Sequence, residues 1–311
     1  MNATTTSPAY PVPSRLNAAV VVLQAAAVAA CFAAIRDISG GWPLAAAAVA
    51  FAVVMNSVYA SIHEAEHGIL FAHPRLNDAA GAALALLFPA PFHLIRQGHL
   101  GHHLRNRTDD EAFDLWFPGE SRVWRWLQFY GILTGFYWMT VVLSIPAALV
   151  APSVFRPRPY RFDRASTAFF ASLDPRFLSW IRIEAALAAA LHAGIVLGAG
   201  IPPLRYALLY AAFGFSWSAM QYVHHYGTER DVVRGARNLW ILPGLDRAWL
   251  NHNWHLTHHK NPSVSWRYLP ALGRREDPDR GFLPWAYLRM WRGPRRASER
   301  VENVHAGRHL P

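Results

Sequence analysis

Two long runs of uncharged residues constrain the fold of this 311-residue chain more than any other feature. Residues 16–35 and residues 42–62 contain no Asp, Glu, Lys or Arg. As helices that rise about 1.5 Å per residue, both are long enough to cross a hydrocarbon core of roughly 30 Å. Because the link at residues 36–41 is short, the two runs predict a transmembrane helical hairpin.

Further apolar runs extend this pattern. Residues 185–200 and 206–223 predict a second hairpin around a proline-containing turn at residues 201–203. Residues 79–95 are apolar but short and contain two prolines, which favours an interfacial or re-entrant helix over a full crossing. Residues 126–151 are long enough to span, but a proline breaks them and their topology stays open. The sequence therefore predicts an all-α integral membrane protein with two transmembrane hairpins and one or more interfacial or re-entrant helices.

The charges indicate which surfaces the chain meets. The formal net charge is +10, and the basic residues stand at the edges of apolar runs rather than in one solvated stripe. This placement suits anionic lipid headgroups and argues against nucleic acid as a partner. The basic stretch at residues 156–161 favours the cytoplasmic side. Since both hairpins begin and end on one face, we expect a polar cytoplasmic cap on a membrane of the bacterial inner-membrane type.

Composition divides the chain into three parts. Residues 1–15, rich in Thr, Ser and Pro, predict a mobile tail, residues 16–270 the membrane domain, and residues 271–311 a basic C-terminal tail. The single cysteine, Cys31, excludes an internal disulfide, a cysteine-ligated zinc site and a self-contained iron–sulfur cluster. Any electrons used by this chain therefore have to come from a separate donor.

Three clusters of histidine stand directly outside the apolar runs. His63 and His67 are four residues apart, and two further clusters each place three imidazoles at positions i, i+3 and i+4. On a helix these offsets bring side chains to one face, about 5–6 Å apart at Cβ, so each cluster is a local metal chelate. The two triple clusters are His99, His102 and His103, and His255, His258 and His259.

The number of histidines indicates two metal ions. Eight imidazoles exceed the four ligands of a structural zinc ion or the three of a catalytic one. Imidazole suits zinc, copper, iron and nickel, so the residue types leave the metal open. The first cluster also has the form His63-Glu64-x-x-His67, in which Glu64 would be the general base of a membrane zinc metalloprotease. That alternative leaves the other two clusters unexplained.

Together the clusters resemble the histidine boxes of the membrane fatty acid desaturase superfamily, which includes alkane, fatty-acyl and carotenoid hydroxylases. The resemblance runs from about Tyr59 to Pro270 and implies two iron ions in the cap, with O2 as co-substrate. The segment His225-Tyr226-Gly227 is similar to the His-Tyr-Gly segment of alkane monooxygenases, which implies that His225 is a ninth ligand. The implied ligands are His63, His67, His99, His102, His103, His225, His255, His258 and His259.

Other polar residues near the boxes are candidates to orient these ligands. A ligating imidazole usually donates its second N–H to a carboxylate or a carbonyl, which fixes the tautomer. We expect this role among the acids close to the boxes, although a solvated loop charge is the alternative for each. Two further histidines are expected beside the ligands. These candidates are Glu64, Asp109, Asp114, His224, Glu229, Asp231 and His252, and Asp110 is the weakest of the acids considered.

The resemblance implies oxidation of an unactivated C–H bond in a fatty-acyl or related lipid chain. A fatty acid desaturase is the first choice, and hydroxylation or oxidative decarboxylation within the same superfamily are the alternatives. A membrane carrier of heme or metal ions would place its ligands at mid-membrane depth, whereas these boxes fall outside the apolar runs. The implied partners are the lipid bilayer and a ferredoxin, rubredoxin or cytochrome b5-type donor with its reductase.

Overall fold

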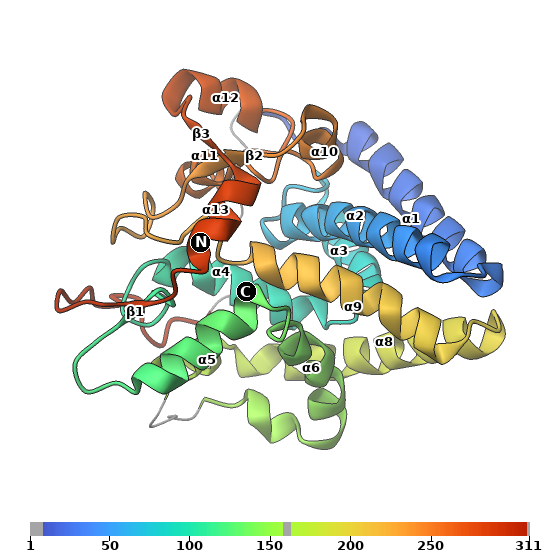
Figure 1. The fold of residues 1–311 in the computed structure, drawn as a ribbon, viewed down its shortest axis with the longest axis horizontal. Coiled ribbons are helices and arrows are strands. Elements are labelled where there is room, and N and C mark those ends of the chain that lie inside the picture. The colour runs from blue at the N-terminus through green and yellow to red at the C-terminus, as the bar shows by residue number, and fades with distance from the viewer. Residues whose placement is uncertain (1–8, 158–162, 310–311) are drawn as a thin grey trace.

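The computed structural model describes residues 9–157 and 163–309. Its long helices point towards one end of the molecule, and shorter helices and loops form a cap at the other end (Figure 1). The helices of the membrane half are α1 (Ser14–Asp37), α2 (Gly41–Glu66), α3 (Pro74–Leu87), α4 (Phe92–Arg105), α5 (Arg122–Leu133), α6 (Trp138–Val150), α8 (Leu178–Gly198) and α9 (Pro203–Met220). The remaining helices are α7 (Arg164–Ser172), α10 (Pro243–Ala248), α11 (His255–Lys260), α12 (Leu269–Glu276) and α13 (Leu283–Met290), with short 3-10 turns η1 (Pro152–Phe155) and η2 (Pro175–Phe177).

Helix α2 lies at the centre of the membrane half and packs against α1, α3 and α9. Phe51 and Met55 of α2 are fully buried in one apolar cluster with Phe213 of α9. One polar contact joins helices in this interior, where Asn56 Nδ2 donates to Ser216 Oγ at 2.8 Å across the α2–α9 contact. Such a bond satisfies a buried donor in an apolar environment and fixes how the two helices meet.

Two pairs of helices are bent sharply. α3 and α4 meet at 103° around Pro89 and Pro91, which lack the N–H that a continuous helix needs. α5 and α6 meet at 95° around Gly135, whose φ is +86° and where a Cβ would lie 2.9 Å from the backbone of Phe215. The first bend agrees with the expected interfacial or re-entrant element at residues 79–95. The expected run at 126–151 is two helices, each bent pair being a broken span or a re-entrant loop.

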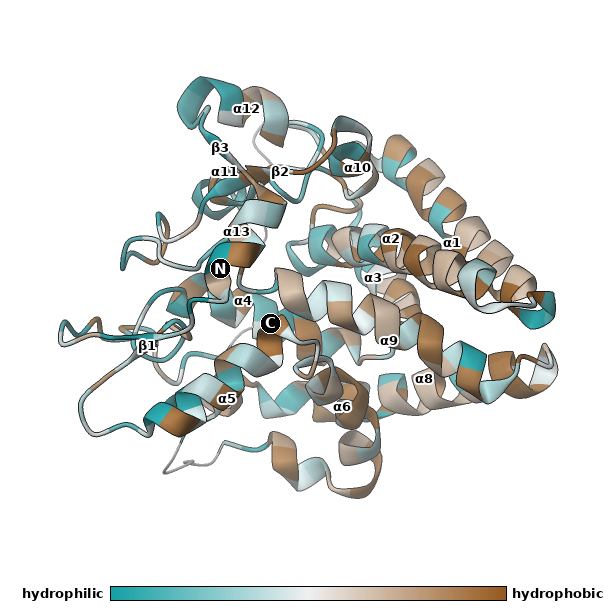
Figure 2. Cartoon of the chain, in the orientation of Figure 1, coloured by the Kyte–Doolittle hydropathy of each residue, from teal (hydrophilic) through white to brown (hydrophobic). Residues whose placement is uncertain are grey.

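Within the described residues, three helical segments are long and apolar enough to cross a membrane, or up to five if each bent pair counts as one span. The three are α1, α2 and the segment Pro175–Gly198, which contains α8. The expected returning arm at residues 206–223 is not among them, because Arg205, two tyrosines and a tryptophan lower the mean hydropathy of α9. α9 still packs along α2. Apolar residues concentrate on the long helices and hydrophilic residues in the cap (Figure 2).

The cap departs from an all-helical fold in a small way. It contains four short strands, β1 (Leu115–Trp116), β2 (Asn238–Trp240), β3 (Arg280–Phe282) and β4 (Arg295–Arg296), paired in parallel as β1–β4 and β2–β3. These pairs join loops that are far apart in the sequence. Where the loops pack together, their backbone N–H and C=O groups lose contact with water and need hydrogen-bond partners, which these short strand pairs supply. Hydropathy patterns detect long helices and carry little signal for such two- and three-residue strands.

The C-terminal part is folded onto the rest of the chain. The expected boundary at 270/271 falls inside α12, and α13 buries Leu283, Ala286 and Met290 against Phe129 and Ile132 of α5. Beyond α13, the Val301 carbonyl accepts from the Asp109 N–H in the loop after α4. Part of the expected basic tail therefore helps to hold the loops that surround the histidines.

Candidate metal centre

One group of histidines joins α2, α4 and α11. His63 lies in the last turn of α2 and His67 is the C-cap of that helix, while His99 and His103 lie one turn apart on α4 and His258 lies on α11. Their ligand nitrogens all lie within 4.8 Å of one another. Nε2 of His99 is 2.7 Å from Nε2 of His67 and 3.1 Å from that of His103. These residues are hereafter the five-histidine group.

A second group joins α4, α11 and the segment after α9. His102 comes from α4, His225 follows α9, and His255 and His259 lie one turn apart on α11. Their ligand nitrogens also lie within 4.8 Å of one another. His255 Nε2 is 3.0 Å from that of His225 and 3.2 Å from that of His259. These residues are hereafter the four-histidine group, and the two groups together contain all nine expected ligands.

The two triple boxes do not each form one chelate, as their spacing alone suggested. In each box the residues at i and i+4 share one group and the residue at i+3 joins the other. On α4, His99 and His103 belong to the five-histidine group and His102 to the four-histidine group. On α11 the division is reversed, because His258 joins the five-histidine group. Positions i and i+3 differ by about 60° around a helix, so each of these helices runs between the two centres.

The hydrogen-bond partner of His225 and the burial of three other ligands indicate how these imidazoles are protonated. His225 Nδ1 lies 2.8 Å from the Gly235 carbonyl, which only accepts, so Nδ1 carries the proton and Nε2 presents a lone pair to its group. Burial, followed by the effect of neighbouring imidazoles, lowers the pKa of His255, His258 and His259 well below its ordinary value. Neutral imidazoles are the form that binds metals.

The donors fit two metal ions. Several Nε2 atoms lie 2.7 to 3.2 Å apart in clusters, and a neutral imidazole has only one N–H to share with its neighbours. Nε2 of His63 is buried with no hydrogen-bond partner within the described part of the chain. A buried polar atom without a partner is costly, and a cation at the centre of each group would satisfy all of these nitrogens. Two all-imidazole sites suit a transition metal.

His224 and His252 lie beside the two groups and belong to neither. His224 is buried, which excludes the solvent-facing alternative, and its Nδ1 donates to the Arg237 carbonyl at 3.2 Å. Burial lowers the pKa of His224 to about 3. The ring of His252 stands 4.6 Å from that of His63 and 5.3 Å from that of His255, so it lies between the groups.

Two glutamates of the first box are buried next to the five-histidine group. Glu64 accepts from Ser265 Oγ at 2.8 Å and from the Trp266 N–H at 3.1 Å. It also lines a cavity of about 10 Å³, room for one water-sized molecule, together with His63 and His252 among other residues. An oxygen of Glu66 lies 3.9 Å from His99 Nδ1, beyond hydrogen-bond distance. Neither carboxylate donates or accepts a hydrogen bond with a box histidine.

Asp114 supports His225 indirectly. It accepts from the guanidinium of the fully buried Arg107, from Tyr222 Oη at 2.7 Å and from the Gly227 N–H at 2.8 Å. Tyr222 and Gly227 flank His225 in the sequence. The expected partner of Asp114 was an imidazole, but the structure pairs it with the buried arginine, which needs a neighbouring anion more strongly than a neutral ring does.

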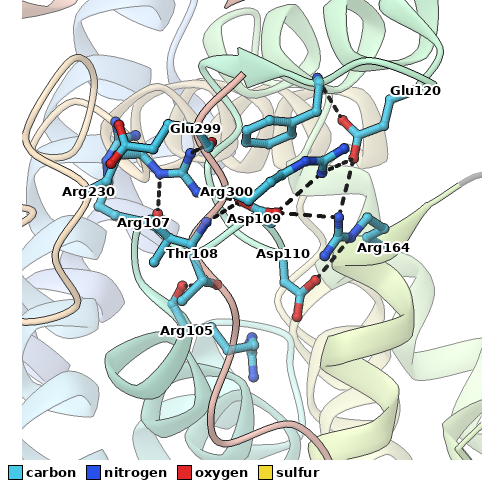
Figure 3. Close-up of polar contacts among 12 residues, drawn as sticks. Arg105, Arg107, Thr108, Asp109, Asp110, Glu120, Arg164, Arg230, Glu299 and Arg300 are labelled. Atoms are coloured by element: carbon cyan, nitrogen blue, oxygen red, sulfur yellow. Dashed lines mark hydrogen bonds and ion pairs between the residues drawn. The ribbon is translucent and has the colours of Figure 1, made fainter. Parts of the chain in front are cut away.

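Of the other expected acids, Asp109, Asp110 and Asp231 have partners away from the histidines. Asp109 is buried and lies between Arg300 and Arg164, with Arg230 Nη2 at 2.5 Å (Figure 3). Asp110 pairs with Arg164. The side chain of Asp231 accepts from the N–H groups of Val233 and Arg234 in a local turn, and Glu229 is exposed. In this region arginines are the nearer and stronger partners of the carboxylates.

Glu111 makes the hydrogen bond to a ligand imidazole that was expected of nearby acids such as Asp109 and Asp114. Its Oε1 lies 2.6 Å from His102 Nδ1 and its Oε2 accepts from Arg105 Nε at 3.0 Å. Burial raises the pKa of Glu111, but the charges and hydrogen bonds of His102 and Arg105 outweigh burial and bring it to about 2. The only signal in the sequence is an acid eight residues after His103, next to Asp109 and Asp110. Which of these three acids reaches His102 depends on the path of the loop after α4.

Comparison with known proteins identifies the class. Residues 40–294 match the model of the family described as fatty acid desaturase, and the chain belongs to that family. It is 25% identical over 248 residues to a temperature-sensitive sn-2 acyl-lipid omega-3 desaturase (ferredoxin), chloroplastic, of Arabidopsis thaliana, covering 71% of this chain and 56% of the relative.

Two more relatives carry desaturase names. The chain is 25% identical over 246 residues to a chloroplastic omega-3 fatty acid desaturase of Glycine max, covering 73% of this chain and 52% of the relative. It is 26% identical over 249 residues to a sphingolipid delta(4)-desaturase of Drosophila melanogaster, covering 77% and 68%. The matched region thus spans about half the length of the first two curated relatives.

Proposed function

We propose that this chain is an oxidoreductase that desaturates a fatty-acyl chain of a membrane lipid. The observation that carries the proposal is the convergence of nine imidazoles into two adjacent groups at the cap end of apolar helices. A pair of iron ions, when bound there, supplies the O2-dependent oxidation. In the balanced reaction, adjacent CH2 groups, O2, two electrons and two protons give a double bond and two water molecules.

The histidine groups would hold the ions, and the membrane helices would present the substrate. Aromatic side chains pack directly beneath the groups, where the Tyr59 ring contacts Phe88, Trp217 and His252. This apolar surround excludes water and suits an acyl chain that arrives from the lipid. The nine histidines of the two groups are all buried or half-buried, which would keep the reacting carbon away from bulk water.

The electrons would come from a separate ferredoxin, rubredoxin or cytochrome b5-type protein with its reductase, on the cytoplasmic side of a bacterial-type inner membrane. A surface hereafter termed the arginine face supports this partner. It consists of Arg289, Arg292, Arg295 and Arg296, all exposed and without an acidic partner in the described part of the chain. Beneath it, Tyr226 Oη donates to the Gly293 carbonyl at 3.0 Å, and Tyr226 directly follows His225. Many redox proteins are acidic, so charge would steer such a donor here.

Hydroxylation is the second candidate. The histidine of the His225-Tyr226-Gly227 segment lies in the four-histidine group, and that segment resembles the alkane-monooxygenase branch. A zinc metalloprotease is disfavoured, because Glu64 Oε2 accepts hydrogen bonds from Ser265 Oγ and the Trp266 N–H, which tie the carboxylate to these residues. The first box also shares its group with three further histidines, more than a catalytic zinc ion uses.

Expression in membranes supplied with iron tests the proposal. Iron content is measured in the purified protein, and the host lipids are analysed by mass spectrometry. Two irons per chain and acyl chains that have lost two hydrogens are expected, with a variant carrying His102→Ala and His258→Ala as the inactive control. New hydroxyl groups would favour the second candidate. A single bound zinc with unaltered lipids would overturn both.

A further inference from the structure

Glu111 stands directly behind the four-histidine group. It lies in the loop between α4 and β1, and its side chain is 14% exposed. Oε1 is 2.6 Å from His102 Nδ1, a short distance typical of a hydrogen bond to a charged acceptor. An ionised carboxylate only accepts, so His102 Nδ1 carries the proton and its Nε2 keeps the lone pair for the group.

This contact is unlike those of the other members of the four-histidine group. His225 Nδ1 donates to the uncharged Gly235 carbonyl, and the Nδ1 atoms of His255 and His259 are buried with no hydrogen-bond partner among the described residues. Within that part of the chain, His102 is therefore the one member whose second nitrogen meets an anion. A carboxylate in this position makes the imidazole a more basic ligand and fixes its orientation.

The five-histidine group lacks an equivalent bond. Its nearest carboxylate contact is Glu66 to His99 Nδ1 at 3.9 Å, and the facing oxygen of Glu66 has no hydrogen-bond partner in the described structure. The two groups thus differ in ligand number, four against five, and in carboxylate support. The group with fewer imidazoles is the one that has the bonded carboxylate.

Glu111 is itself held in place. Arg105 Nε donates to its second oxygen at 3.0 Å, and Arg105 Nη1 donates to Ser172 Oγ of α7 at 3.2 Å. Arg105 reaches these partners by folding back over its own helix at Gly101, where a Cβ would overlap the guanidinium. The glycine of the second box thus makes room for the side chain that positions Glu111.

We propose that Glu111 is a positioning residue that orients His102 and supplies negative charge to the four-histidine group, so that the two metal positions differ in affinity. The proposal rests on the proposed function only in taking both groups to bind metal. The competing explanation is that Glu111 merely pairs with Arg105 to join α4 to α7. Glu111→Gln separates the two, because the amide keeps the size and an accepting oxygen but removes the charge.

The test is titration of the metal-free full chain in detergent micelles with Co2+, followed by its absorption spectrum. The native chain should bind two ions, and Glu111→Gln should bind one of them about 10- to 100-fold more weakly. The weakened band should be the one that His259→Ala removes, since His259 belongs only to the four-histidine group. Glu111→Ala should weaken it further.

Asp110→Asn is the matched control. It removes the same charge one residue away, and the contacts of Asp110 are with Arg164 and Asn303, not with a histidine. Its Co2+ binding should equal that of the native chain. If the two Glu111 variants bound both ions with the same affinities as the native chain, the proposal would be overturned. Parallel weakening of both ions with a lowered melting temperature would overturn it too, since that is the signature of a structural role. Failure of the native chain to bind two ions would instead count against the proposed function.

Discussion

Replacing a single histidine should reduce the amount of bound iron by an amount that depends on its group. His102→Ala leaves three imidazoles in its group, whereas His258→Ala leaves four in the other. We expect His102→Ala to fall to about one iron per chain and His258→Ala to stay close to two, because affinity follows the number of ligands. Metal analysis of the purified variants measures this, with His305→Ala, outside both groups, as the control. Equal iron loss in the two variants would show that the groups are not divided as described.

The buried imidazoles should make the metal-free protein sensitive to acid. Burial lowers the pKa of His224 to about 3 and lowers those of His255 and His259 well below the ordinary value near 6.5. Below pH 6.5 the unfolded chain therefore binds protons that the folded chain does not, and stability falls as pH falls. Each unit of pKa shift corresponds to roughly 1.4 kcal/mol.

Thermal melting of chelator-treated protein in detergent between pH 7.5 and 5 measures this effect. The melting temperature should drop steadily with acidification, and the metal-loaded protein should be less affected until the ions dissociate. A melting temperature that is flat over this range would contradict the assignment of buried, neutral imidazoles.

At this scale the sequence identified the nine clustered histidines from spacing and resemblance, and the structure brings all nine together. It did not identify Glu111. The choice among Asp109, Asp110 and Glu111 depends on how the loop after α4 turns, and the arginines that bind the first two come from residues more than 50 positions away. Long-range ion pairs of this kind leave no periodic signal.

Among the elements, α4 and α11 decide the geometry of the centre. Box spacing predicted that the three histidines of each box form one chelate, and this was right only for the residues at i and i+4. It could not predict that the i+3 residue of each box belongs to the opposite group, because that depends on which side of each helix faces which centre. The packing of α4 on α2, α3 and α7 sets this orientation, and no local pattern encodes it.

The network of Arg107, Asp114 and Tyr222 links the loop after α4 to the segment after α9. Asp114→Asn removes the anion beside a fully buried guanidinium, and we expect it to cost about 3–5 kcal/mol. Tyr222→Phe removes one hydroxyl and should cost about 1–2 kcal/mol. Since both changes loosen the segment that carries His225, iron in the four-histidine group should decrease as well.

Thermal melting and metal content of the two variants in detergent check this prediction. Asp231→Asn is the control, since its side chain caps a local turn at Val233 and Arg234. A stability loss from Asp114→Asn no larger than that of Asp231→Asn would show that the buried ion pair does not hold this segment.

For the whole molecule, charge-free runs were enough to predict a helical membrane protein with a polar cap. They located α1 and α2 to within four residues at each end, but placed the start of α8 seven residues too late. They missed the short parallel strands and the folding of residues 283–296 onto α5, because these contacts join segments that are 42 to 180 residues apart. Hydropathy reports which residues avoid water, and it does not report which distant loops pair.

The arginine face should set the rate at which an acidic electron donor reduces the protein. Residues 281–298 contain no acid, and within this stretch the Gly293 carbonyl accepts a hydrogen bond from Tyr226, which directly follows His225. Replacing Arg292 and Arg296 together by Glu should slow reduction by an acidic ferredoxin roughly tenfold at low salt, since steering depends on complementary charge.

The difference in reduction rate between this variant and the native chain should shrink as salt approaches about 0.5 M, where screening acts over a few ångströms. Stopped-flow reduction across ionic strengths measures this, and the control is a variant with Arg274 and Arg275 of α12 together replaced by Glu, which makes the same change in net charge elsewhere on the cap. If this α12 variant slowed reduction as much, net charge and not the arginine face would guide the donor, and rates independent of salt in the native chain would exclude electrostatic docking altogether.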